Sequence, residues 1–206
     1  MKTVFSRLTS LTAALAAVAM LTLGAASGAQ AADLKILVVN QATVFQNSLA
    51  GKDRSKKLQE IFKAIQDDEA KEMEPLKQEA ITLQQQKAIL SAEDFGKKQV
   101  DLQRRVQFAQ YKFEQERAAT ERAAQQLMFS KLYPVLNEVM QEKKGTLLMD
   151  QSQVLMVSPD FNVTDEVVKR MDAKSPSIDL KRITWAEIEA VLKKQQEALQ
   201  AQQGGQ

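Results

Sequence analysis

The sequence contains no cysteine and no histidine. Without cysteine there are no disulfides, no thiolate nucleophile and no cysteine-linked lipid anchor. Without histidine the commonest general base is missing, and the two absences together remove every metal site that needs His or Cys ligands. We therefore expect a protein that is not an enzyme and that uses no cofactor or metal.

Glycine is also scarce, and between residues 32 and 200 it occurs only at Gly51, Gly96 and Gly145. No GxxxxGK[ST] or GxGxxG segment can be drawn, so the backbone nest that cradles nucleotide phosphates is not expected. Carboxylates are plentiful, and residues 67–69, which are Asp-Asp-Glu, could be read as a calcium-binding or catalytic cluster. Consecutive residues of a helix point in different directions, however, so we interpret this run as a solvated helix face.

The amino terminus has the features of a secretory signal peptide. Lys2 and Arg7 precede the mostly apolar stretch Leu8–Leu23, and Ala29–Ala31 is an A-x-A cleavage site. A membrane anchor is the alternative, but the apolar stretch is short and no basic cluster follows it. We expect export to the periplasm with cleavage of residues 1–31 after Ala31.

Cleavage would change the charge of the chain. Of the 28 basic residues two lie in the signal segment, and all 26 acidic residues follow it, so the mature chain has 26 of each and is neutral. A neutral chain gives no electrostatic reason to expect a nucleic-acid partner.

A long stretch rich in Gln, Glu, Lys, Ala and Leu dominates the rest of the chain. Its pattern predicts one helix over Asp53–Leu90 and a second over Ala92–Lys143, with Ser91 capping the second. Apolar residues of the second helix recur at steps of three and four, which is typical of a coiled-coil seam. We expect an antiparallel hairpin arm over residues 53–126, with its tip near residues 90–92.

Two prolines and a glycine mark irregular points in these helices. Proline inside a helix removes a backbone donor and crowds the preceding turn. The apolar stripe of the first helix fades just before Pro75, so we predict a hinge of the arm there, and we predict a kink at Pro134. Gly145 is expected to end the second helix with a left-handed cap, and Gly51 is expected to loosen the chain before the first.

Short apolar segments on both sides of the arm predict a small body over residues 32–52 and 127–174. Lys35–Val39 is predicted as a strand, and Thr146–Asp150 and Val154–Ser158 as two more strands joined by a tight loop. Asn40 and Thr164 are predicted to cap short helices. Three short strands bury too little surface alone, so copies of the chain are expected to complete the core. The residues predicted to form this oligomerisation body are Ile36, Val38, Phe45, Leu147, Met149, Leu155 and Val157.

Residues 175–206 are predicted to form a carboxyl-terminal extension. Thr184 begins a capping box, and a helix with one apolar side follows to about Gln200, before a disordered end. Trp185 is expected either to fold back onto the body, which we favour, or to dock a partner. The fold class is therefore α+β and dominated by helices.

Several of these segments resemble the Skp (OmpH-like) periplasmic chaperones. Lys35–Gln46 is similar to the first strand and helix of that family, Leu147–Asp150 to its closing strand and Asn162–Met171 to its last helix. A charged, Gln-rich hairpin lies between them here as it does in the family. The resemblance, which covers residues 34–172, implies a homotrimer shaped like a jellyfish. Its arms would surround a cavity that holds unfolded outer-membrane proteins without ATP.

An ATP-independent holdase is thus the leading hypothesis, and a structural coiled-coil spacer or adaptor of the cell envelope is the alternative. A holdase needs many weak apolar contacts on its arms. The candidates for these contacts are Met73, Ile81, Ile89, Phe108 and Tyr111, although each could instead pack the hairpin. Near the tip a basic patch fits a solvated helix face, which we favour, or weak contact with anionic lipid or lipopolysaccharide. The patch consists of Lys97, Lys98, Arg104 and Arg105.

Overall fold

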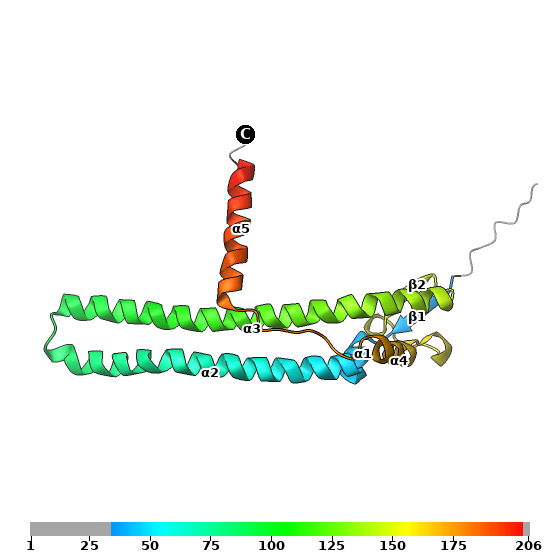
Figure 1. The fold of residues 1–206 in the computed structure, drawn as a ribbon, viewed down its shortest axis with the longest axis horizontal. Helices are drawn as coiled ribbons and strands as arrows, with labels where there is room; N and C mark the ends of the chain where they lie inside the picture. The colour runs from blue at the N-terminus through cyan, green and yellow to red at the C-terminus, as the bar shows by residue number, and fades with distance from the viewer. Residues whose placement is uncertain (1–33, 204–206) are drawn as a thin grey trace, which may run out of the picture. The chain divides into compact units, whose positions relative to one another are not determined.

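The computed structural model describes residues 34–203, so the predicted signal segment lies outside the described residues. Residues from Lys35 onward form one unit, in which helices predominate and a pair of strands is small (Figure 1). The elements in chain order are β1 (Ile36–Val39), α1 (Gln41–Asn47), α2 (Leu49–Gln85), η1 (Gln86–Ala88), α3 (Ala92–Glu142), β2 (Leu147–Asp150), η2 (Gln151–Gln153), η3 (Pro159–Phe161), α4 (Thr164–Lys174) and α5 (Trp185–Gln203).

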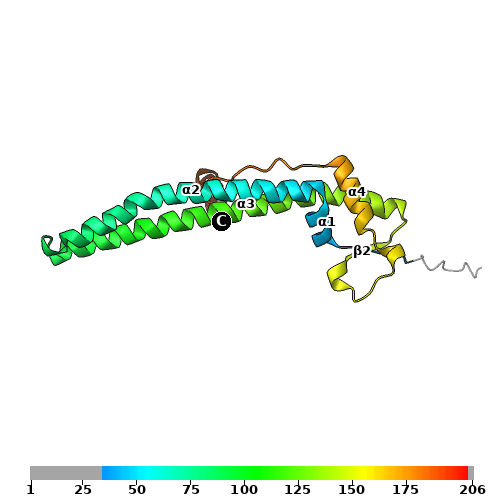
Figure 2. The same ribbon diagram turned by 90° about the horizontal axis from the view of Figure 1, so that it is seen from below.

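The predicted hairpin is confirmed, with α2 and α3 running side by side in opposite directions (Figures 1 and 2). At the tip, the Ser91 hydroxyl accepts a hydrogen bond from the Asp94 N–H at 3.0 Å and donates to the Asp94 carboxylate at 2.7 Å. This cap stops the chain from continuing η1 and starts α3 at the predicted residue. Members of the predicted seam, including Leu102, Ala109 and Phe113, are buried.

The first helix begins earlier than predicted, at Leu49, because Ser48 caps it and accepts a hydrogen bond from the Gly51 N–H at 3.2 Å. The prediction that Gly51 loosens the chain is wrong. Gly51 is buried in the first turn, where an added Cβ would lie 1.7 Å from the Phe45 carbonyl oxygen. The missing side chain lets α1 and α2 approach each other closely.

The second helix ends as predicted within a residue, but its left-handed residue is Lys144, with φ of 53°, and not Gly145. The Gly145 N–H donates to the Met140 carbonyl at 2.8 Å, which is the longer bond of a Schellman cap. Space at 145 is limited, since an added Cβ would lie 2.6 Å from Leu37 Cδ1 and the buried Leu37 side chain would have to shift.

The sheet consists of β1 and β2 in parallel, with Ile36 opposite Leu147 and Val38 opposite Met149. The prediction of a strand over Val154–Ser158 is wrong. The chain forms the short turn η2 after β2, and residues 154–158 then have no regular structure. The Asp150 carboxylate accepts a hydrogen bond from the Ser152 N–H at 2.8 Å and starts that turn.

Beyond η3, the chain returns to β1 and starts α4. Asn162 forms an isolated bridge with Val38. Thr164 is the first residue of α4 and not its cap. The Asn162 side-chain oxygen accepts from the Thr164 N–H at 3.0 Å, and the Thr164 hydroxyl accepts from the Asn40 N–H at 2.9 Å. Thr164 therefore ties α4 to the start of α1, which Asn40 caps as predicted.

One hydrophobic core joins the body, the root of the arm and the tail. It gathers Leu37 of β1, Met128 and Leu132 of α3, and Met171 of α4. Ile178 and Leu180, at 2% and 7% exposed, belong to the same core although they lie beyond α4. Residues 175–184 run along the hairpin without regular structure before α5 begins (Figures 1 and 2).

Candidate functional site

The arm exposes the apolar side chains that were predicted from the sequence. Ile81, Ile89, Phe108 and Tyr111 are 53%, 84%, 52% and 49% exposed, and Met73 is half-buried. Other residues pack the hairpin, so these four are not needed to hold α2 against α3. Their role in binding stays a prediction, but the structure makes them available for it. Val100, at 67% exposed, belongs with them and was missed.

A groove crosses the arm beside Pro75. Its lining combines the apolar side chains of Pro75, Leu76 and Phe108 with charged residues from both helices: Glu72, Glu79, Arg104 and Arg105. Ion pairs at the rim join the two helices, since Lys112 contacts Glu72 and Arg105 contacts Glu79. Sequence reasoning missed the groove because it depends on which residues of α2 stand opposite which residues of α3.

At the tip, three of the four cations of the basic patch have carboxylate partners. Lys97 pairs with Glu93 at 2.6 Å, and Arg104 and Arg105 both contact Asp101, at 2.6 and 3.0 Å. The hydrogen bond from Arg104 is the main reason that the pKa of Asp101 is lowered. Exposed pairs of this kind add little stability, but they reduce the positive potential of the patch. Lipid contact there stays a prediction.

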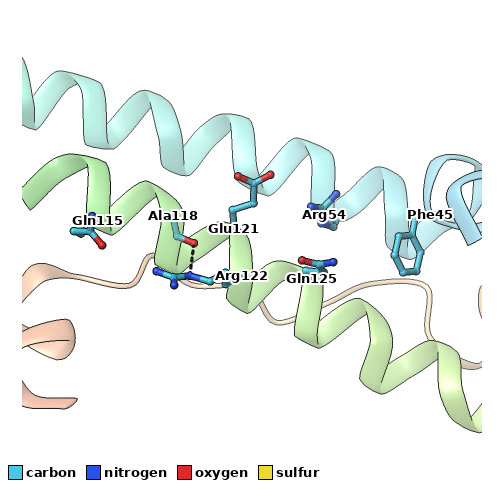
Figure 3. Close-up of a pocket in the computed structure, with 7 residues that line it drawn as sticks. All are labelled: Phe45, Arg54, Gln115, Ala118, Glu121, Arg122 and Gln125. Carbon is cyan, nitrogen blue, oxygen red and sulfur yellow. Dashed lines mark hydrogen bonds between the residues drawn. The ribbon is translucent and has the colours of Figure 1, made fainter. Parts of the chain in front are cut away.

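A more polar pocket lies nearer the root of the arm (Figure 3). Arg54 of α2 and a row of α3 side chains line it, and Phe45 of α1 stands at one end. The Arg122 Nε donates to the Ala118 carbonyl at 3.1 Å, which holds one guanidinium along the wall. Guanidinium and amide groups suit hydrogen bonds to a peptide. The remaining lining residues are Gln115, Glu121 and Gln125.

Within residues 34–203 no cluster of acidic side chains could hold a metal ion, and no helix is long and apolar enough to span a bilayer. The acidic run at residues 67–69 is a solvated face only in part. Asp67 is exposed, whereas Asp68 and Glu69 are half-buried and pair with Arg182 and Arg117 of other segments.

The residues predicted to join copies of the chain divide into two groups. Val38 is 2% exposed and belongs to the chain's own core, whereas Leu147 and Leu155 are 44% and 104% exposed. The others, which are Ile36, Phe45, Met149 and Val157, are half-buried. Met156 and Phe161, at 91% and 41% exposed, extend the apolar surface and were missed.

The tail contacts the arm through a charged cluster that sequence reasoning missed. Arg182 Nε donates to Glu116 Oε2 at 2.9 Å, and Arg182 Nη1 donates to Asp68 at 2.6 Å. The hydrogen bond from Arg182 is the main cause of the lowered pKa of Asp68. Burial lowers the pKa of Arg182, but its hydrogen bonds to both carboxylates outweigh burial and raise that pKa. The signal in the sequence was Glu116 itself, a charge within the apolar seam.

Trp185 follows this cluster and packs on exposed aromatics of α3. Its ring meets Phe108 and Tyr111 edge to face, with centroids 5.7 and 5.8 Å apart. The backbone N–H of Trp185 donates to Glu116 Oε1 at 2.7 Å. The tryptophan folds back, as favoured, but onto the arm and not onto the body.

Comparison with known proteins agrees with this architecture. No curated protein sequence matches the chain. A crystal structure from Caulobacter crescentus CB15, described as a candidate outer membrane chaperone (OmpH-like), is similar in fold. Its TM-score is 0.59 at 24% identity, over 72% of this chain and 90% of that one. The family model for outer membrane protein (OmpH-like) matches residues 35–171. That span is most of the chain and coincides with the resemblance seen in the sequence, so the protein belongs to the OmpH-like family.

Proposed function

We propose that this protein is a periplasmic, ATP-independent holdase that binds unfolded outer-membrane proteins between the arms of a homotrimer. The observation that carries the proposal is the row of exposed apolar side chains along a charged helical arm, in a chain of the OmpH-like family. The signal-like amino terminus supports export, with cleavage after Ala31.

The chemistry of the arm suits a holdase. Apolar side chains such as Ile81 and Ile89 stand among Lys, Arg, Glu and Gln, while Phe108 and Tyr111 share the Trp185 ring, so the arm offers several small apolar contacts. Many weak contacts bind varied sequences, while the surrounding charge disfavours association of the arms with one another. The groove beside Pro75 adds apolar contacts with a polar rim.

The body supports assembly from several copies. A two-stranded parallel sheet is small for an independent core, and Leu155 and Met156 beside it are almost fully exposed. Exposed apolar surface of this kind is typical of protein interfaces. Association through the body would leave the arms free to enclose a client.

Replacing Ile81, Ile89, Phe108 and Tyr111 together with serine should weaken binding of a urea-unfolded outer-membrane protein at least about tenfold. The reason is that loss of each exposed side chain removes a fraction of the roughly 1.5–3 kcal/mol available from full burial. Suppression of client aggregation, measured by light scattering without ATP, reports the effect.

A matched control replaces four exposed glutamines of the same helices, Gln84, Gln85, Gln103 and Gln110, with serine. It should keep both helicity and binding. Equal activity of the two variants would contradict the role of the apolar residues. A wild-type protein that never suppresses aggregation would overturn the holdase proposal and favour the envelope spacer.

Pro75 is proposed as the hinge that lets the cavity fit clients of different size. Pro75 lies inside α2, and Figure 2 shows the hairpin bending gradually over its distal half. Pro75→Ala should restore a backbone donor and stabilise α2 by up to about 3 kcal/mol. The stiffer arm should then bind large barrel proteins less well than small ones, in the same aggregation assay.

Pro134→Ala provides the control, because Pro134 lies inside α3 close to the body. That change should stabilise α3 without altering the dependence on client size. If Pro75→Ala left the ratio of large-client to small-client affinity unchanged, bending at Pro75 would have no part in binding.

A further inference from the structure

Glu116 is a buried carboxylate on the arm, at 4% exposed. It stands in the seam of α3, between Phe113 and Thr120, where an apolar residue is the rule. Burying a carboxylate is costly unless it is paired and hydrogen-bonded. Among the described residues, the hydrogen bonds to its two oxygens come from the Arg182 guanidinium and the Trp185 backbone N–H, both in the tail.

The arm therefore contains a site that is complementary to an extended peptide. Glu116 of α3 and Asp68 of α2 form an acidic notch that accepts a guanidinium. Next to the notch, the Thr120 hydroxyl accepts a backbone hydrogen bond from the Ile183 N–H at 3.0 Å. Phe108 and Tyr111, farther along α3, take an aromatic ring. The ligand chemistry is an arginine followed, within a few residues, by an aromatic side chain.

This site overlaps the surface proposed for clients. Phe108 lines the groove beside Pro75 and also contacts the Trp185 ring. Tyr111 is shared in the same way between the predicted client contacts and the tail. A client segment cannot use these two rings fully while Trp185 lies against them.

We propose that residues 182–185 act as an internal ligand that masks part of the client surface and is displaced by client segments with an arginine and an aromatic residue. The inference rests on the proposed holdase function. The tail closes the site in the free protein, and a client opens it. The released tail stays attached, because Ile178 and Leu180 remain in the core.

Release of the tail leaves Glu116 and Thr120 to bond with water or with a client, and it does not require the core at Ile178 and Leu180 to open. Beyond Trp185, the apolar residues Val191, Leu192 and Leu199 of α5 are already 55%, 50% and 59% exposed. Release of α5 therefore uncovers little new apolar surface of that helix. The apparent client affinity of a masked site is the affinity of the open site multiplied by the fraction of molecules in which the site is open. Removing the mask should therefore strengthen client binding.

Trp185 is the only tryptophan in the chain, so its fluorescence reports docking directly. The experiment compares wild type with Arg182→Ala and Glu116→Gln in the full-length protein. Glu116→Gln removes the charge pair without leaving an unpaired buried carboxylate. Lys181→Ala is the matched control, because Lys181 is exposed and contacts only Asp179, at 3.9 Å, among the described ion pairs.

Both tail-releasing variants should shift the Trp185 emission to the red and raise its quenching by acrylamide at least about twofold, with unchanged helicity. The affinity of Arg182→Ala for a dye-labelled, urea-unfolded barrel protein should be about three to ten times tighter than that of wild type. Glu116→Gln should gain less, because it also removes a carboxylate that would bind the arginine of a client. The barrel protein has its tryptophans replaced by phenylalanine, so that adding it to wild type shifts the Trp185 emission only by displacing the tail.

Client binding by wild type without any change in Trp185 emission would overturn the inference and leave the holdase function standing. Release of Trp185 in Arg182→Ala with equal or weaker client affinity would do the same. If neither wild type nor the variants bound a client, the proposed function itself would fail, and the inference with it. Binding by the variants alone would support the inference.

Discussion

Replacing Val38 with aspartate is expected to abolish the folded body. Val38 is 2% exposed, lies opposite Met149 in the sheet, and its carbonyl accepts the Val163 N–H at 2.9 Å. A carboxylate there would be buried with no partner, at a cost of several kcal/mol. Typical domains are stable by only about 5–15 kcal/mol. Loss of the cooperative melting transition in circular dichroism, with loss of the assembled species in size exclusion with light scattering, reports the effect.

Val100→Asp makes the same chemical change on the arm, where the side chain is 67% exposed. That variant should melt like wild type and keep its mass. Wild type is expected to be a trimer in the same measurement. A Val38→Asp protein that melted at the wild-type temperature would show that β1 does not support the body, and a wild-type monomer would contradict the proposed assembly.

The parts of the fold that sequence reasoning predicted well are those set by local pattern. The seam of α3 needs only the spacing of its apolar residues, and the tip needs only the Ser91 cap three residues before Asp94. The strand pair was predicted from apolar runs of β-branched and aliphatic residues. The family resemblance came from the order of these same segments, and the family model confirms it.

The errors lie where distant residues decide the conformation. Val154–Ser158 has the composition of a strand, but Asn162 rather than this segment bridges to Val38 in the described chain. Gly145 was assigned a left-handed conformation, but Lys144 takes the positive φ, and Gly145 instead lies close to the Leu37 side chain. Neither contact can be read from spacing, since Leu37 and Gly145 are far apart in the sequence.

In the candidate site, too, local pattern predicted some residues, and contacts between distant residues decided the others. Exposure of Ile81, Ile89, Phe108 and Tyr111 could be predicted because these residues fall off the apolar seam. The contact between Arg182 and the notch of Glu116 and Asp68 could not be predicted, because Glu116 and Arg182 are 66 positions apart. A buried charge in a seam nevertheless indicates that a partner exists, and here the partner is the segment beyond the family match. The arm and the tail therefore pair through charges that neither segment could satisfy alone.

Gly51→Ala is expected to destabilise the protein by about 3 kcal/mol, which is the upper range for an overpacked site. The added Cβ would lie 1.7 Å from the Phe45 carbonyl oxygen and 3.2 Å from Ser48 Oγ. A backbone carbonyl cannot rotate away as a flexible side chain can, so α1 must separate from α2. For a chain of this size the melting temperature should fall by about 6–12 °C, which circular dichroism at 222 nm would measure.

Gly96→Ala makes the identical substitution in the first turns of α3, where an added Cβ meets nothing within 4 Å. Alanine favours a helix interior over glycine by about 1 kcal/mol, so this variant should be as stable as wild type or slightly more stable. The two changes have the same effect on the unfolded chain, and their difference isolates the contact with Phe45. If Gly51→Ala were as stable as Gly96→Ala, the junction between α1 and α2 would be loose, and Gly51 would be the flexible linker that the sequence first suggested.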